Sequence, residues 1–248
     1  MLGHSHAMSG LTVGAATLPL APVHTPAAQV AWIVAVGGFA MLPDLDTGGV
    51  TARHGLPRMH GSTIALMWGP VTCVLAGLVA RVVGGHRNGT HSVVGVVMTA
   101  LAASGLALFY PGRLVLLALA IGLALEAMAF AIPGRLEQMW PINLLVSFAS
   151  AWWLLDPHGA AVAGRYPAWM TLAVLVGCAT HIAGDLLTVG GVPLGWPLSE
   201  SRQALGLFRT GSKLEKFLVA PAFCAAAVLL LAHEWAGGPA VLASLGHR

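Results

Sequence analysis

The sequence predicts an all-α, polytopic membrane protein with about six to eight apolar helices, and three observations support this fold class. Hydrophobic residues make up 57% of the 248 residues and charged residues only 8%, whereas an ordinary soluble domain has about 25% charged residues. Several apolar stretches approach the roughly 20 residues that a membrane-spanning helix needs. The few polar groups gather in short clusters between these stretches. We therefore expect one integral membrane domain over residues 1–248.

In chain order, the apolar stretches predict spans near 27–43, 92–110, 114–132, 168–187 and 217–233, with shorter helices at 5–20 and 141–155. No lysine or arginine precedes the first apolar region, so a cleavable signal peptide is not indicated and the first helix is expected to be retained. The three cysteines stand singly in apolar segments, which argues against a disulfide framework. The basic residues form no dense patch, so nucleic-acid binding is not expected.

The stretch 62–83 is long enough to cross a membrane, but Gly69 and Pro70 interrupt it in the middle. Proline removes a backbone donor, so we expect a re-entrant or interfacial segment. If 62–83 does not cross, all the polar clusters share one face of the membrane. That face then carries nine of the twelve basic residues: Arg53, Arg58, Arg81, Arg87, Arg135, Arg202, Arg209, Lys213 and Lys216. The positive-inside rule makes it the cytoplasmic face of the inner (plasma) membrane. If 62–83 does cross, a single shared site is impossible.

Five clusters hold the ionisable residues of interest: "GHSHAMSG" at 3–10, "MLPDLDTGG" at 41–49, "GGHRNGTHS" at 84–92, "THIAGDLLTVGG" at 180–191 and "LFRTGSKLE" at 207–215. Ionisable groups near a membrane interior are costly and are usually paired or functional. Asp44 and Asp46 can face one cation from a turn, or they can simply end a helix in a polar turn. His181 and Asp185 stand at i and i+4 on one helical face. They can ligate a metal together, or the carboxylate can orient the imidazole.

The cluster at 84–92 combines two histidines with an arginine. His86 and His91 can ligate a metal, and Thr90 is expected to cap the following helix. Arg87 offers a guanidinium fork that suits phosphate or carboxylate. Mixed histidine and aspartate ligation suits zinc, manganese or iron, and of these we expect zinc first.

The motifs "SHAMSG", "LPDLD", "HRNGTHS", "HIAGDLLTVGGVPLGWPL" and "FRTGSKLE" follow one another over most of the chain. In this the sequence resembles the YdjM-like family of membrane-bound, metal-dependent hydrolases, although the apolar stretch between the second and third motifs is unusually long here. The resemblance implies a metal and catalytic set of His6, Asp44, Asp46, His86, His91, His181 and Asp185, with the three aspartates as the catalytic candidates. It also implies Arg87, Arg209, Ser212 and Glu215 as substrate or supporting residues.

These residues favour a hydrolase in which a bound metal activates water for attack on an ester. A phosphoester of a lipid or amphiphile is the preferred substrate, because arginine can clamp phosphate. A transporter of divalent cations is a second hypothesis, but its polar residues would lie at mid-membrane depth in related halves. A third is a membrane anchor that recruits a soluble partner through the loop at 190–216. The oligomeric state stays open.

Overall fold

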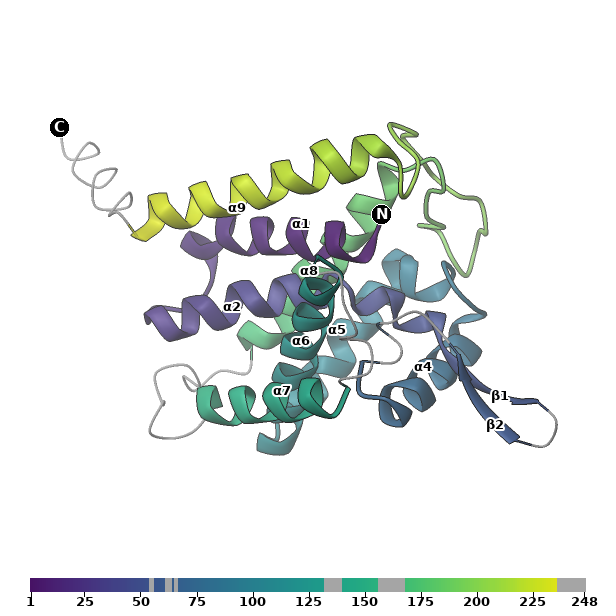
Figure 1. Ribbon diagram of the computed structural model, residues 1–248, viewed down its shortest axis with the longest axis horizontal. Helices are drawn as coiled ribbons and strands as arrows, with labels where there is room; N and C mark the ends of the chain where they lie inside the picture. The colour runs from purple at the N-terminus through teal and green to yellow at the C-terminus, as the bar shows by residue number, and fades with distance from the viewer. Residues whose placement is uncertain (54–55, 61–63, 65–66, 132–139, 156–167, 236–248) are drawn as a thin grey trace.

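A computed structural model describes residues 1–53, 56–60, 64, 67–131, 140–155 and 168–235. Within these residues the chain forms a bundle of helices with one β-hairpin (Figure 1). The helices are α1 (Gly3–Ala16), α2 (Pro26–Phe39), α4 (Pro70–Val83), α5 (Val93–Ala107), α6 (Tyr110–Ala131), α7 (Trp140–Leu155), α8 (Ala168–Leu186) and α9 (Ala220–Trp235). Shorter helical turns are η1 (Leu18–Leu20), η2 (Leu42–Thr47), η3 (Gly89–His91) and η6 (Glu215–Val219).

The expected class of helical membrane protein is confirmed. Four segments are long and apolar enough to cross a membrane: Pro26–Thr47, Tyr110–Ala127, Trp169–Leu186 and Glu215–Glu234. Helices α4, α5 and α7 are apolar but shorter. Each predicted helix has a counterpart whose ends differ by a few residues. Three of the basic residues of the chain lie outside the described residues: Arg135, Arg165 and Arg248.

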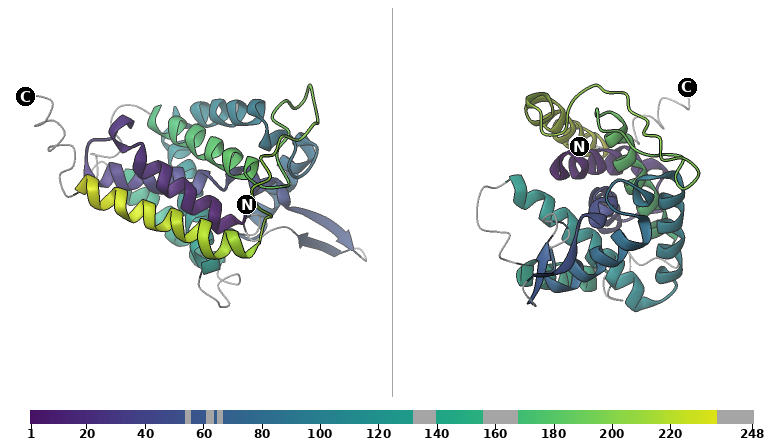
Figure 2. Two further views of the ribbon diagram at one scale, coloured as in Figure 1. Left: turned by 90° about the horizontal axis from the view of Figure 1, so that it is seen from above. Right: turned by 90° about the vertical axis from the view of Figure 1, so that its right-hand side faces the viewer.

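The β-hairpin is a departure from the all-α prediction. Strands β1 (Gly49–Arg53) and β2 (Leu56–His60) pair antiparallel, with Gly49 opposite His60. The hairpin projects away from the helices (Figures 1 and 2). Its strands are only five residues long, so the alternating pattern typical of a strand is too short to be recognised in the sequence. A lone two-stranded hairpin is also marginally stable.

Helix α2 lies at the centre of the bundle and packs against α1, α6 and α8. Small residues allow these close approaches, as is common between membrane helices. A Cβ atom on Gly10 of α1 would lie 2.6 Å from the Cβ atom of Ala40, and one on Gly38 would collide with the carbonyl oxygen of Ala120 in α6. Helix α1 is thereby held against the end of α2 from which the site is built.

The described part of the segment 62–83, residues 64 and 67–83, is not one continuous helix. Helix α4 begins only at Pro70, directly after Gly69, whose φ of +56° interrupts the helical backbone. At the other end of α4 the chain turns through Gly84 in the left-handed conformation. This path returns the chain to where it started, because His86 contacts Asp46 of η2. Residues before and after the segment therefore lie at one place, as a non-crossing path requires.

Candidate metal centre

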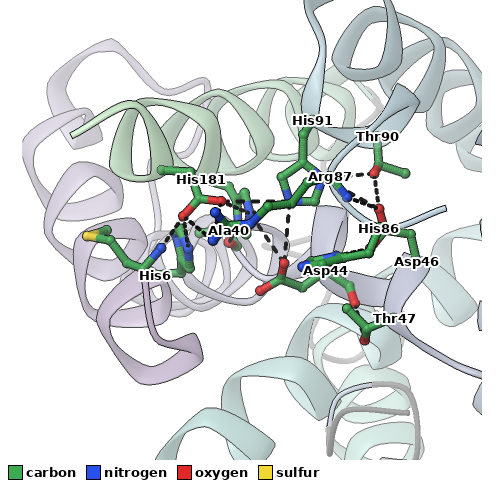
Figure 3. A network of polar contacts seen from close by, with 12 residues as sticks. His6, Ala40, Asp44, Asp46, Thr47, His86, Arg87, Thr90, His91 and His181 are labelled. Carbon is green, nitrogen blue, oxygen red and sulfur yellow. Dashed lines mark hydrogen bonds and ion pairs between the residues drawn. The ribbon is translucent and has the colours of Figure 1, made fainter. Parts of the chain in front are cut away.

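Four of the five polar clusters meet at one end of the helix bundle (Figure 3). His6 comes from the first turns of α1, Asp44 and Asp46 from η2, His91 from η3, and His181 and Asp185 from the last turns of α8. Except for Asp44, which is half-buried, these side chains are buried. Because buried charged groups are stable only when paired or bound to a metal, the cluster is a candidate metal centre.

Three side-chain atoms form a triangle of the size that a zinc ion requires. The Nε2 atoms of His91 and His181 lie 3.1 Å apart. The Asp44 Oδ1 atom lies 3.4 Å from the first and 3.6 Å from the second. Tetrahedral ligands about 2.0–2.1 Å from zinc lie about 3.3 Å from one another. The triangle therefore matches one face of a tetrahedral site.

A backbone carbonyl fixes the tautomer of His181. The Nδ1–H group of His181 donates to the Ala40 carbonyl oxygen at 2.7 Å, which is free because α2 ends at Phe39 and leaves its last carbonyls without helical partners. With the proton on Nδ1, the Nε2 lone pair faces His91 and Asp44. Such a carbonyl or carboxylate partner is typical of histidines that ligate metals.

Asp46 supports the site through a set of hydrogen bonds. Its carboxylate lies 2.7 Å from His86 Nδ1 and accepts from the Thr90 hydroxyl at 2.6 Å and from the Arg87 backbone N–H at 3.2 Å. Its Oδ2 atom also lies 3.5 Å from His91 Nδ1. The Thr90 hydroxyl lies closer to this nitrogen, at 2.9 Å, and donates its own hydrogen to Asp46. Thr90 and Asp46 together can therefore orient the imidazole whose Nε2 atom faces Asp44 and His181.

The predicted role of Thr90 as a helix cap is wrong. Ser92 caps α5, since its hydroxyl accepts from the backbone N–H of Gly95 at 2.9 Å. Thr90 lies two residues earlier, in η3, where its hydroxyl donates to Asp46. A hydroxyl side chain does cap α5, as predicted, but the capping residue lies two positions after Thr90.

The charge of the two η2 carboxylates acts on His91, which lies outside the membrane-spanning segments. Burial lowers the pKa of its imidazole, but hydrogen bonds to Asp44 and Asp46, together with their charges, outweigh burial. The pKa of His91 is raised from the usual 6.5 to about 9. Without a metal, His91 is therefore protonated at neutral pH.

Asp185 joins a second set of groups to the triangle. Its Oδ2 atom lies 3.9 Å from the Nε2 atoms of both His91 and His181. Its Oδ1 atom lies 3.2 Å from His6 Nε2 and also contacts the amino group of Met1. The His6 ring stacks on His181 with centroids 3.7 Å apart. In the described part of the chain, His6 Nδ1 lacks a hydrogen-bond partner, and the contacts of His6 Nε2 and Asp185 Oδ2 are ion pairs without hydrogen-bond geometry.

These contacts define three overlapping groups of possible metal ligands, each with its ligand atoms within 4.8 Å of one another. The groups are His6, His181 and Asp185; Asp44, His91 and His181; and Asp44, Asp46 and His86. All seven residues predicted to be ligands are present in these groups. The group of Asp44, His91 and His181 is the best candidate for one ion. The group that contains His86 is less suitable, because His86 is partly exposed and is already hydrogen-bonded to Asp46.

Arg87 is the predicted substrate residue that lies in the centre. Its Nη2 atom lies 3.1 Å from Asp185 Oδ2. Its backbone has a φ of 59°, which is uncommon for a residue other than glycine, and the hydrogen bond to Asp46 holds it there. A strained residue next to unpartnered polar groups is typical of functional sites.

The other predicted substrate residues lie around the start of α1 and α9. Glu215 is buried and accepts from the backbone N–H groups of Leu2 at 2.6 Å and Gly211 at 2.7 Å. The Ser212 hydroxyl accepts from the Glu215 N–H at 3.3 Å. Arg209 is exposed, and among the described residues its side chain makes no hydrogen bond or ion pair with the centre. Glu215 thus fixes the segment that carries His6, a supporting role.

Sequence reasoning missed the two groups that hold the imidazoles. The Ala40 carbonyl carries no side-chain signal, and its role follows only from the end of α2 beside α8. The Thr90 contact could have been suspected from a hydroxyl next to His91.

Comparison with known proteins agrees with the motifs. Residues 1–245 match the profile of the family described as YdjM inner membrane protein, so the chain belongs to this family. No curated protein and no solved structure matches the chain.

Proposed function

We propose that this member of the YdjM inner membrane protein family is a metal-dependent hydrolase acting on a phosphoester of a lipid or another amphiphile. The observation that carries the proposal is the triangle of His91 Nε2, His181 Nε2 and Asp44 Oδ1. Two imidazoles and a carboxylate form the ligand set of several catalytic zinc sites, and imidazole ligands suit zinc better than manganese; the same set also binds iron, and we propose zinc ahead of it. When bound, such an ion supplies a Lewis acid and lowers the pKa of water toward 7.

The residues around the triangle have separate tasks. Ala40 keeps the Nε2 atom of His181 unprotonated, and Asp46 orients His91 from its Nδ1 side. The Oδ2 atom of Asp185 lies 3.9 Å from both imidazole nitrogens and 3.1 Å from its ion-pair partner, the Arg87 Nη2 atom. It can complete the ligand set or accept a proton from the attacking water, because a general base needs only to reach that water.

Arg87 is proposed to bind the phosphate. Its guanidinium is 18% exposed and already lies against a carboxylate of the centre, so it can reach a substrate there. Guanidinium groups pair well with phosphate oxygens and offset the charge that develops on them during hydrolysis. The nine basic residues that the expected topology assigns to this side favour the cytoplasmic face.

Metal content is the first test. The detergent-purified protein should contain at least one equivalent of zinc by mass spectrometry, and His181→Ala and Asp185→Ala should lose it. His24→Ala is the matched control, since His24 is exposed and remote in sequence from the five motifs. The loaded protein should then release product from phospholipid vesicles. Stoichiometric metal in both site variants would contradict the assignment, and folded protein without metal would favour the anchor hypothesis.

A further inference from the structure

An apolar groove of about 260 Å³ lies between α1, α2, α6 and α7. Its walls are formed by Ala7 and Leu11 of α1, residues between Val30 and Gly37 of α2, and residues of α6 and α7. Ser150 is the one polar residue in the lining. A groove of this composition cannot hold a charged group, because nothing in its walls would replace the lost hydration. It can hold a hydrocarbon.

No residue of the metal centre lines the groove, but two lining residues lie close to the centre along α1 and α2. Ala7 directly follows His6 in α1, and Gly37 lies three residues before Ala40, whose carbonyl holds His181. Helix α1 leads away from the centre while α2 returns to it (Figure 1), so Val30 marks the far end. Gly37 and Val30 are seven positions apart, which corresponds to about 10 Å at the rise of an α-helix.

The groove also opens toward the surface of the bundle. Val30 is 41% exposed and Leu11 is half-buried although both line it. Val30 belongs to the candidate span Pro26–Thr47, so this opening lies within a membrane-spanning segment. An alkyl chain can therefore enter the groove sideways from the bilayer.

We propose that this groove binds the alkyl chain of a phosphate-bearing amphiphile whose phosphate lies at the metal centre. The inference rests on the proposed function, because it takes the phosphate position from Arg87 and the ligand triangle. It adds a binding site for the alkyl tail, formed by α1, α2, α6 and α7, which selects substrates by their alkyl chain. Each buried methylene group favours the bound state about fourfold, so the tail contributes to affinity independently of the metal.

Photolabelling can test the tail site directly. The probe is dodecyl phosphate with a diazirine at the end of its chain, and dodecanol with the same diazirine is the control. In detergent-purified protein, the phosphate probe should label groove residues at least about tenfold more than the alcohol, since loss of a charged anchor weakens binding on that scale. Labelled peptides are identified by mass spectrometry.

Two tryptophan variants of α6 provide the matched comparison. Ala124→Trp fills the groove, whereas Val115→Trp adds the same side chain at a position that is 42% exposed and outside the lining. Groove labelling should fall about tenfold in Ala124→Trp and stay unchanged in Val115→Trp. Ser150→Phe narrows the groove from α7 and should act like Ala124→Trp. Metal content serves as the folding check for each variant.

The outcomes separate the two proposals. Equal labelling by the phosphate and alcohol probes, or unchanged labelling in both groove-filling variants, would overturn the tail site and indicate ordinary filling by bilayer lipid. Hydrolysis with intact metal binding but labelling only elsewhere would overturn the tail site alone. Phosphate-dependent groove labelling in a protein without metal would support the tail site and count against the hydrolase.

Discussion

Replacing Asp46 with Asn tests whether this carboxylate serves the metal by holding His91. The substitution keeps the shape of the side chain but removes its charge and one of its two acceptor oxygens. Those oxygens contact His86 Nδ1 at 2.7 Å, the Thr90 hydroxyl at 2.6 Å and the Arg87 N–H at 3.2 Å. Loss of such a supporting partner typically weakens metal binding about 10- to 100-fold, or about 1.4–2.7 kcal/mol.

The protonation of His91 makes this loss depend on pH. A metal can bind the imidazole only after its proton leaves. With a pKa of about 9, proton competition weakens wild-type metal binding about 100-fold at pH 7 and hardly at all above pH 9.5. Asp46→Asn removes one of the two carboxylates that raise this pKa, so the variant suffers less competition. Its deficit should therefore be largest near pH 9.5 and smaller at pH 7.

The assay is a zinc titration against a chelator of known affinity at both pH values. Glu200→Gln, a loss of charge at an exposed position, should bind zinc like the wild type throughout. A deficit that is the same at both pH values would refute the link between Asp46 and the pKa of His91. Unchanged affinity at both would refute the supporting role itself.

Three further predictions follow from the same structure. In the metal-free protein, the raised pKa of His91 contributes stability that is fully present below about pH 6.5 and is lost as pH rises through about 9. Thermal unfolding should therefore show a decline in the free energy of unfolding on the order of 3 kcal/mol over this range. The decline should be absent in His91→Gln. Gly38→Val should lower the melting temperature by overpacking against the Ala120 carbonyl, at a cost of about 1–3 kcal/mol or more, whereas Gly105→Ala, which meets nothing within 4 Å, should not. Arg87→Met should retain its metal but lose about 10- to 100-fold in kcat/KM, with partial recovery in Arg87→Lys; an unchanged kcat/KM would remove Arg87 from substrate binding.

The helices and much of the cluster could be predicted from the sequence because the chain contains so few charges. Long apolar runs located the helices, and any aspartate or histidine at their ends stood out. His181 and Asp185 were the clearest pair, since their spacing puts both on one face of α8. Their proximity to Asp44 and His91 followed only from assuming that 62–83 turns back, which depended on Gly69 and Pro70.

Other features could not be predicted because they depend on backbone positions and on tertiary packing. The Ala40 carbonyl becomes a partner for His181 only where α2 ends beside α8. The different roles of Asp44 and Asp46 also could not be predicted from "PDLD". They arise because η2 turns Asp44 toward the imidazole Nε2 atoms and Asp46 toward His86 and Thr90. Spacing alone treats the two carboxylates as equivalent.

The charge of the cluster favours a bound cation. Asp44, Asp46 and Asp185 contribute three negative charges, while Arg87 and the Met1 amino group that contacts Asp185 contribute two positive charges, so the cluster carries a net charge of −1 when the imidazoles are neutral. Such an imbalance is costly in a buried site. Protonation of His91 removes it, in agreement with the raised pKa, and a metal cation can take the place of that proton. Metal binding should therefore release about one proton near neutral pH, a quantity that calorimetry in buffers of different ionisation enthalpy can measure.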